Sequence, residues 1–163
     1  METLQRDYFA EIYHQKVWHS QDDDARCTNR FMIKESMNPA FVRKTRVARK
    51  ASTCDEKYLL KDVWSPRDGD VRFEVTTTEY YTLSGAREAY FQMLWTSERL
   101  NSRAEGTLPV GEVSFGCDGY LCFIRNNVCI AIHIITRMEN PSDTWLLGEL
   151  AEAIDRQIIS ERK

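Results

Sequence analysis

The fold is decided by residues 120–135, which read Tyr-Leu-Cys-Phe-Ile-Arg-Asn-Asn-Val-Cys-Ile-Ala-Ile-His-Ile-Ile. Two apolar runs flank the pair Asn126-Asn127. Asparagine tolerates the left-handed backbone that a two-residue hairpin turn requires. The stretch therefore predicts a β-hairpin made of residues 119–125 and 128–135, in which Phe123 faces Ile130.

The two faces of this hairpin have different consequences. One face carries large aliphatic and aromatic side chains, and each contributes about 1.5–3 kcal/mol when fully buried. The other face is also largely apolar, and its residues are Tyr120, Cys122, Ile124, Cys129, Ala131 and His133. A contiguous apolar face needs a cover. Two covers remain open: the chain's own residues 3–19 or 37–62, or a second copy or protein partner.

The remaining elements follow from hydrophobic periodicity and turn signals. The pattern predicts an amphipathic helix over residues 3–19, a short strand at 31–34, a turn at 65–70 and a strand at 71–83 with one face in the core and one in water. It also predicts a helix from an N-cap at Ser84 to about residue 100, a strand at 112–115, and a final helix capped by Ser142 or Asp143. Residues 37–62 show no clean period.

This order predicts one α+β domain spanning residues 1–163. Sequential antiparallel strands with helices packed mainly on one face form a two-layer sandwich. The element order is similar to that of roadblock-like domains, longin-like domains and dimeric secretion chaperones. Fold similarity of this kind does not determine function.

Composition excludes several classes of protein. The 163 residues are 42% hydrophobic with a net charge of −3, which argues against disorder and against a globally basic nucleic-acid binder. No stretch has the roughly 20 apolar residues of a membrane span. The five cysteines are odd in number and lack zinc spacing. With no signal-peptide core at the N-terminus, they favour a cytoplasmic location, or a periplasmic or lipoprotein one if a leader has been removed.

A basic cluster gives the second functional hypothesis. Five of the eight residues 43–50 are basic: Arg43, Lys44, Arg46, Arg49 and Lys50. Such a cluster can bind phosphate or nucleic acid through counterion release. The cluster has no clear aromatic interleaving, and the chain as a whole is acidic, so a solvated strand or loop is the simpler interpretation.

No pattern nominates catalytic residues, a metal site or a cofactor. His14 and His19 are five residues apart on a helix, which is poor spacing for zinc ligands. Cys129 and His133 are four apart on one strand, too far for the hydrogen bond that a catalytic pair needs. Residues 68–70, Asp-Gly-Asp, lack the remaining ligands of a calcium loop. An unrecognised enzyme is a third hypothesis.

The C-terminal third resembles the end of certain uncharacterised bacterial domains found in exported proteins or lipoproteins. The residues that carry the resemblance are Gly111, Glu112, Phe123, Arg125, Asn127, Val128, Leu150, Ala151, Ile154 and Asp155. They cover about fifty residues and consist mostly of scaffold positions. The resemblance implies an extracytoplasmic location and transfers no active site.

These observations favour a non-enzymatic domain that self-associates or binds a protein through the outer hairpin face, with phosphate binding at residues 43–50 as the alternative.

Overall fold

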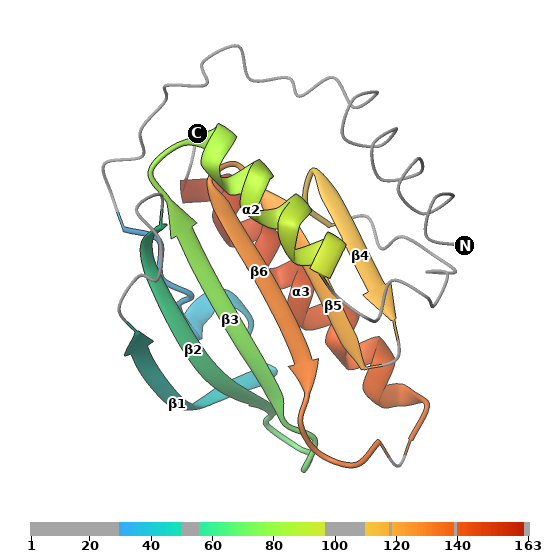
Figure 1. The fold of residues 1–163 in the computed structure, drawn as a ribbon. Coiled ribbons are helices and arrows are strands. Elements are labelled where there is room, and N and C mark those ends of the chain that lie inside the picture. The colour runs from blue at the N-terminus through green and yellow to red at the C-terminus, as the bar shows by residue number, and fades with distance from the viewer. Residues whose placement is uncertain (1–29, 50–55, 97–109, 118, 139, 162–163) are drawn as a thin grey trace, which may run out of the picture.

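A computed structural model of the chain describes residues 30–49, 56–96, 110–117, 119–138 and 140–161. The elements in order are η1 (Glu35–Met37), β1 (Phe41–Arg49), β2 (Glu56–Pro66), β3 (Phe73–Tyr80), α2 (Leu83–Thr96), β4 (Val113–Cys117), β5 (Tyr120–Arg125), β6 (Val128–Ile134) and α3 (Ser142–Glu161). The strands form a six-stranded sheet in the order β1-β2-β3-β6-β5-β4, and every neighbouring pair is antiparallel (Figure 1).

The predicted hairpin is confirmed, including its register. Phe123 pairs with Ile130 on the two strands β5 and β6. Asn126 adopts the left-handed backbone with φ 53°. The Asn127 side-chain amide donates a hydrogen bond to the Tyr80 carbonyl at 2.7 Å, and the Tyr80 amide donates to the Asn127 carbonyl at 2.9 Å. The turn is therefore tied to the end of β3 as well as closing the hairpin.

The main core lies between the sheet and α3. Its sheet side includes Phe73, Val75, Leu121, Phe123, Ile130 and Ile132. The helix contributes the predicted stripe of Leu147, Leu150, Ala151, Ile154 and Ile158, while Leu146 is only partly buried. The period of α3 was readable from sequence because its apolar residues recur along one side of the helix. η1 joins α3 on this inner face, where Met37 packs against the core.

The antiparallel sheet and the α+β class are confirmed, and the helices differ in the face that they cover. Figure 1 shows α3 behind the sheet and the shorter α2 in front of it. Residues of α2 pack with Cys122, Ile124 and Cys129 in a second core cluster on the outer face. The N-cap prediction was wrong by two residues, because the Gly85 amide donates to the Thr82 hydroxyl at 2.9 Å.

Two predictions about the first half of the chain need correction, and one region without an assignment gains one. Residues 31–34 are extended but belong to no strand, because side chains and not a neighbouring strand bind their backbone. The unassigned region 37–62 contains β1 and most of β2. The alternation expected over 71–83 holds through Thr77, and then Thr78 and Tyr80 are buried on the outer side. The predicted helix 3–19 lies outside the described residues.

The residues 65–70 form a turn as predicted, with β2 ending at Pro66. In the part of the chain that the structure describes, no helix combines the length and the apolar character needed to cross a membrane.

An ion pair joins the hairpin to α3. The Arg125 guanidinium donates to the two carboxylate oxygens of Asp155, each at 2.8 Å. These hydrogen bonds raise the pKa of Arg125. Asp155 also accepts a hydrogen bond from the Gly111 amide at 2.9 Å. Asp155, which is 5% exposed, thus fixes both the hairpin end and the chain entering β4.

Substitution of Gly111 tests how closely the junction between the hairpin, β4 and α3 is packed. Its φ is +68°, and a Cβ there would lie 2.7 Å from the Ile124 carbonyl oxygen. We expect Gly111→Ala to lower the free energy of unfolding by about 2 kcal/mol or more, because alanine is strained at positive φ and no space is available. Urea denaturation measures the change.

The matched control is Gly69→Ala, because a Cβ at Gly69 meets only Pro66 at 3.5 Å and its φ is not positive. We expect this control to change stability by about 1 kcal/mol or less. Equal effects of the two substitutions would contradict the assigned backbone.

Candidate functional site

The outer hairpin face is half covered by the protein itself. Cys122 and Ile124 are fully buried and Cys129 is 7% exposed. Above them lies Tyr90 of α2, whose hydroxyl donates to the Cys122 carbonyl at 3.4 Å. The Cys129 thiol donates to the carbonyl of Ala86 at 3.6 Å. These three predicted partner-binding residues therefore form the surface against which α2 packs.

The other three predicted residues lie at the border of α2. Tyr120, Ala131 and His133 are all partly exposed. The rings of Tyr120 and His133 meet edge to face with centroids 6.3 Å apart. The Tyr120 hydroxyl lies 3.8 Å from the sulfur of Met93. The sequence suggested two intramolecular covers for this face. The described part of residues 37–62 does not cover it, because it forms β1 and most of β2, and Met37 packs against the inner core. Residues 3–19 lie outside the described residues.

Sequence reasoning missed α2 as the cover, although a signal was present. Tyr80 falls on the side of β3 that was expected to face water. A large aromatic residue at that position indicates that something packs over the end of the strand. In the structure Tyr80 belongs to the second core cluster with Ala86 and Tyr90.

Beyond α2, the outer face of the first strands has no helix in front of it among the described elements (Figure 1). We call this surface the open outer face; its residues are Val42, Val47, Leu59, Lys61, Val63, Glu74, Thr76, Ala131 and His133. Val47 is 53% exposed, and the other residues are partly exposed. Lys61 and Glu74 form an ion pair of 2.9 Å across β2 and β3. The surface thus combines aliphatic side chains with one pair of opposite charges.

The predicted phosphate-binding cluster does not converge on one site. Arg46 donates to both carboxylate oxygens of Asp62, at 2.7 and 2.6 Å. Arg43 lies 3.9 Å from Glu35. Lys44 and Arg49 are exposed on β1, and Lys50 lies outside the described residues. Two of the five basic residues are therefore already engaged by carboxylates of the same chain.

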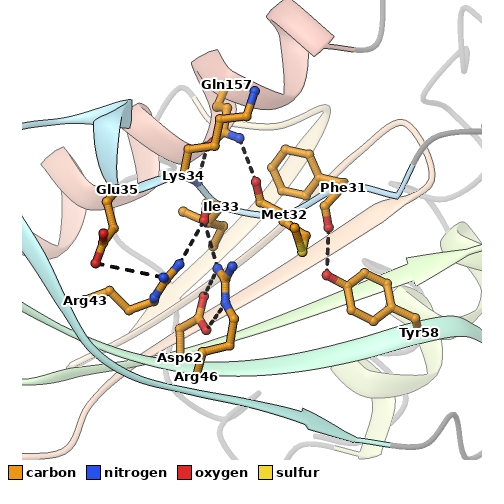
Figure 2. A network of polar contacts seen from close by, with 10 residues as sticks. All are labelled: Phe31, Met32, Ile33, Lys34, Glu35, Arg43, Arg46, Tyr58, Asp62 and Gln157. Atoms are coloured by element: carbon orange, nitrogen blue, oxygen red, sulfur yellow. Dashed lines mark hydrogen bonds and ion pairs between the residues drawn. The ribbon is translucent and has the colours of Figure 1, made fainter.

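Arg46 belongs to a polar network that holds residues 31–34 against the inner face of the sheet (Figure 2). The Arg46 guanidinium donates to the Ile33 carbonyl at 2.8 Å, and its hydrogen bonds with Asp62 raise its pKa. The Tyr58 hydroxyl donates to the Phe31 carbonyl at 2.9 Å. Side chains from β1 and β2 thus satisfy backbone carbonyls that have no strand partner.

Two further residues complete the network. The buried Glu79 carboxylate accepts a hydrogen bond from the Phe31 amide at 2.8 Å. Gln157 of α3 donates to the Met32 carbonyl at 2.8 Å and accepts from the Lys34 amide at 3.0 Å. Phe31 and Ile33, each 1% exposed, insert into the core. The network therefore anchors an extended segment through its backbone and its alternate side chains.

Sequence reasoning did not identify Asp62, Glu79 or Gln157 as members of this site. Glu79 was the available signal, because it interrupts the apolar face of β3 at a position where a core residue is expected. A charged residue is almost never fully buried without a partner. The carboxylates of Asp62 and Glu79 are both 0% exposed. Each forms an ion pair, Asp62 with Arg46 and Glu79 with Lys57.

The metal-site and nucleophile hypotheses considered from the sequence find no support in the described residues. In those residues no group of three or more His, Cys, Asp or Glu side chains is arranged to hold a metal ion. Burial raises the pKa of the Cys129 thiol, which is the opposite of what activates a nucleophile. His14 and His19 lie outside the described residues. Asp68 lies in the turn after β2.

Comparisons with protein-family models, curated proteins and solved structures found no match for this chain.

Removal of one partner of the Arg46–Asp62 pair should be strongly destabilising. We expect Asp62→Asn to lower the free energy of unfolding by about 2 kcal/mol or more, because it leaves a guanidinium that is only 22% exposed without its counter-charge. Chemical denaturation followed by tryptophan fluorescence measures the loss.

Glu74→Gln is the matched control, since it also neutralises one carboxylate in an ion pair. Both partners of the Lys61–Glu74 pair are about one-third exposed, at 35% and 34%. We expect a change of about 1 kcal/mol or less. An equal loss in the two variants would show that burial does not distinguish the pairs.

The position of α2 predicts the reactivity of the two buried thiols. We expect Cys122 and Cys129 to react with iodoacetamide on the order of a hundredfold more slowly in the native protein than in urea, because α2 must open first. Mass spectrometry of peptides quantifies labelling at each cysteine. Rapid native labelling of both residues would place α2 elsewhere.

Proposed function

We propose that this protein is a non-enzymatic interaction domain that self-associates through the open outer face. The observation that carries the proposal is the position of α2, which covers the hairpin half of the outer face and leaves aliphatic residues of β1 and β2 accessible. Val47, at 53% exposure, is the most accessible of them. A sheet face that leaves several aliphatic side chains accessible to solvent is a candidate protein contact site.

The charges on the open outer face support a second copy as the occupant. Lys61 and Glu74 lie side by side on adjacent strands. In a two-fold symmetric contact the same surface meets itself, so that Lys61 can oppose Glu74 of a second copy. The remaining contacts pair aliphatic side chains with aliphatic side chains. Such a surface is complementary to itself in both charge and polarity.

The proposal modifies the one based on sequence. Ala131 and His133 belong to the open outer face, Tyr120 lies beside it, and all three are partly exposed. The helix α2 packs against the other three predicted residues, Cys122, Ile124 and Cys129. The alternative of phosphate or nucleic-acid binding through residues 43–50 has less support, because Arg43 and Arg46 are turned toward Ile33 and the carboxylates of Glu35 and Asp62.

Substitution at the centre of the open outer face tests self-association. We expect the wild type to form dimers at about micromolar concentrations and Val63→Arg to weaken the association by about tenfold or more, because the contact then buries an unpaired charge. Sedimentation equilibrium over a range of concentrations measures the dissociation constant. Val47→Arg, at an exposed position, repeats the test with little risk to folding.

The control is Ile159→Arg, which places the same charge at a 40% exposed aliphatic residue on α3. It should leave the dissociation constant unchanged. A wild type that stays monomeric throughout the range, or association that survives Val47→Arg, would overturn the proposal.

A further inference from the structure

β1 is an edge strand, and the direction of its backbone groups can be derived from the sheet. In an antiparallel ladder, residues bonded to one neighbouring strand alternate with residues bonded to the other. The Tyr80 amide bonds to the Asn127 carbonyl, so the even-numbered residues of β3 pair with β6 and the odd-numbered ones with β2. Carried across β2, this alternation directs the backbone of Lys61 toward Val47 of β1.

The neighbours of Val47 on β1 therefore point their backbone groups away from β2. These neighbours are Arg46 and Ala48, whose N–H and C=O groups lie along the outer edge of the sheet. No strand lies beyond β1 among the described residues, as Figure 1 shows. An unpaired edge of this kind can accept an extended segment of another chain as an added strand.

The charge of β1 defines which segment fits. The strand reads Phe-Val-Arg-Lys-Thr-Arg-Val-Ala-Arg, with four basic residues and no acidic one. Lys44 and Arg49 are exposed on it. A second copy of β1 is disfavoured as the added strand, because facing strands would bring like charges together. An acidic strand, by contrast, would place its carboxylates beside these cations.

We infer that the β1 edge binds an extended, acidic segment of another protein by strand addition. The straight part of β1 after the bulge between Arg43 and Thr45 provides the hydrogen-bonding register. On the outer face of the sheet the added strand lies beside Val47 and Arg49. Its side chains on that face are accordingly apolar and acidic. The edge adjoins the open outer face at Val47, and the two proposals are separated by Ala48→Pro, which changes the edge backbone and no side chain of that face.

The probe is a blocked, fluorescent peptide of about eight residues in which glutamate alternates with valine. We expect it to bind the full-length protein, and we expect Ala48→Pro to weaken binding by about tenfold or more. Proline removes the outward N–H of Ala48 and is tolerated on an edge strand, because that N–H has no partner in β2. Fluorescence anisotropy measures the affinity.

Four controls separate strand addition from simple charge attraction. Ala48→Thr keeps the N–H and should bind as the wild type does. The double variant Lys44→Glu with Arg49→Glu should lose binding, and so should a peptide with lysine in place of glutamate. An oligothymidylate of the same charge should bind more weakly than the peptide and equally to the wild type and Ala48→Pro.

The inference is overturned if the peptide does not bind, or if its affinity is the same for Ala48→Pro and Ala48→Thr. It is also overturned if the oligonucleotide binds more tightly than the peptide, because the edge would then be a polyanion site. Sedimentation of Ala48→Pro and Ala48→Thr reads self-association independently, because the Ala48 side chain lies on the opposite face of the sheet from Val47.

Discussion

The left-handed backbone of Asn126 sets the register of β5 and β6, and that register assigns every side chain of the hairpin to one of two cores. Phe123 and Ile130 go to the α3 side, whereas Cys122 and Cys129 go to the α2 side. A slip of one residue would exchange the two sets, because side chains alternate across a strand. The small thiols would then face the long helix and leave its aliphatic stripe without contacts. The turn thus determines which helix each face can accept.

A second constraint acts at the other end of the sheet. Asp62 and Glu79 are buried carboxylates, and a buried charge is stable only when it is paired and hydrogen-bonded. Arg46 satisfies one of them, and the Phe31 amide and Lys57 satisfy the other. These requirements fix the path of residues 31–34, which close the inner face where α3 does not reach. The strands therefore carry both the apolar core and the polar anchor of the segment that completes it.

The hairpin and α3 were readable from sequence because their patterns are local: a two-asparagine turn between apolar runs, and a stripe recurring every three or four residues. The side of the sheet taken by α2 was not readable, since Ala86 and Tyr90 suit either face and only the tertiary structure chooses. β1 was missed because it is an edge strand whose exposed, charged residues and bulge erase the period of two. The network around Ile33 was missed because its hydrogen bonds join residues far apart in the chain, such as Lys34 and Gln157.

The two sides of the sheet consequently differ in how much of their surface the helices cover. The β6–β5 side is covered on both faces, by α2 and α3, and its strands are almost entirely buried. The β1–β2 side is covered on its inner face alone among the described elements, and it ends in an edge whose backbone groups at Ala48 point outward. The core draws on both sides, since Phe41 of β1 and Trp64 of β2 pack in the main cluster with Phe123 and Ile130, whereas the exposed residues of β1 lie outside it. Residues such as Val47 and Lys44 lie outside both core clusters, and under the two proposals their aliphatic and basic side chains serve contacts with other chains.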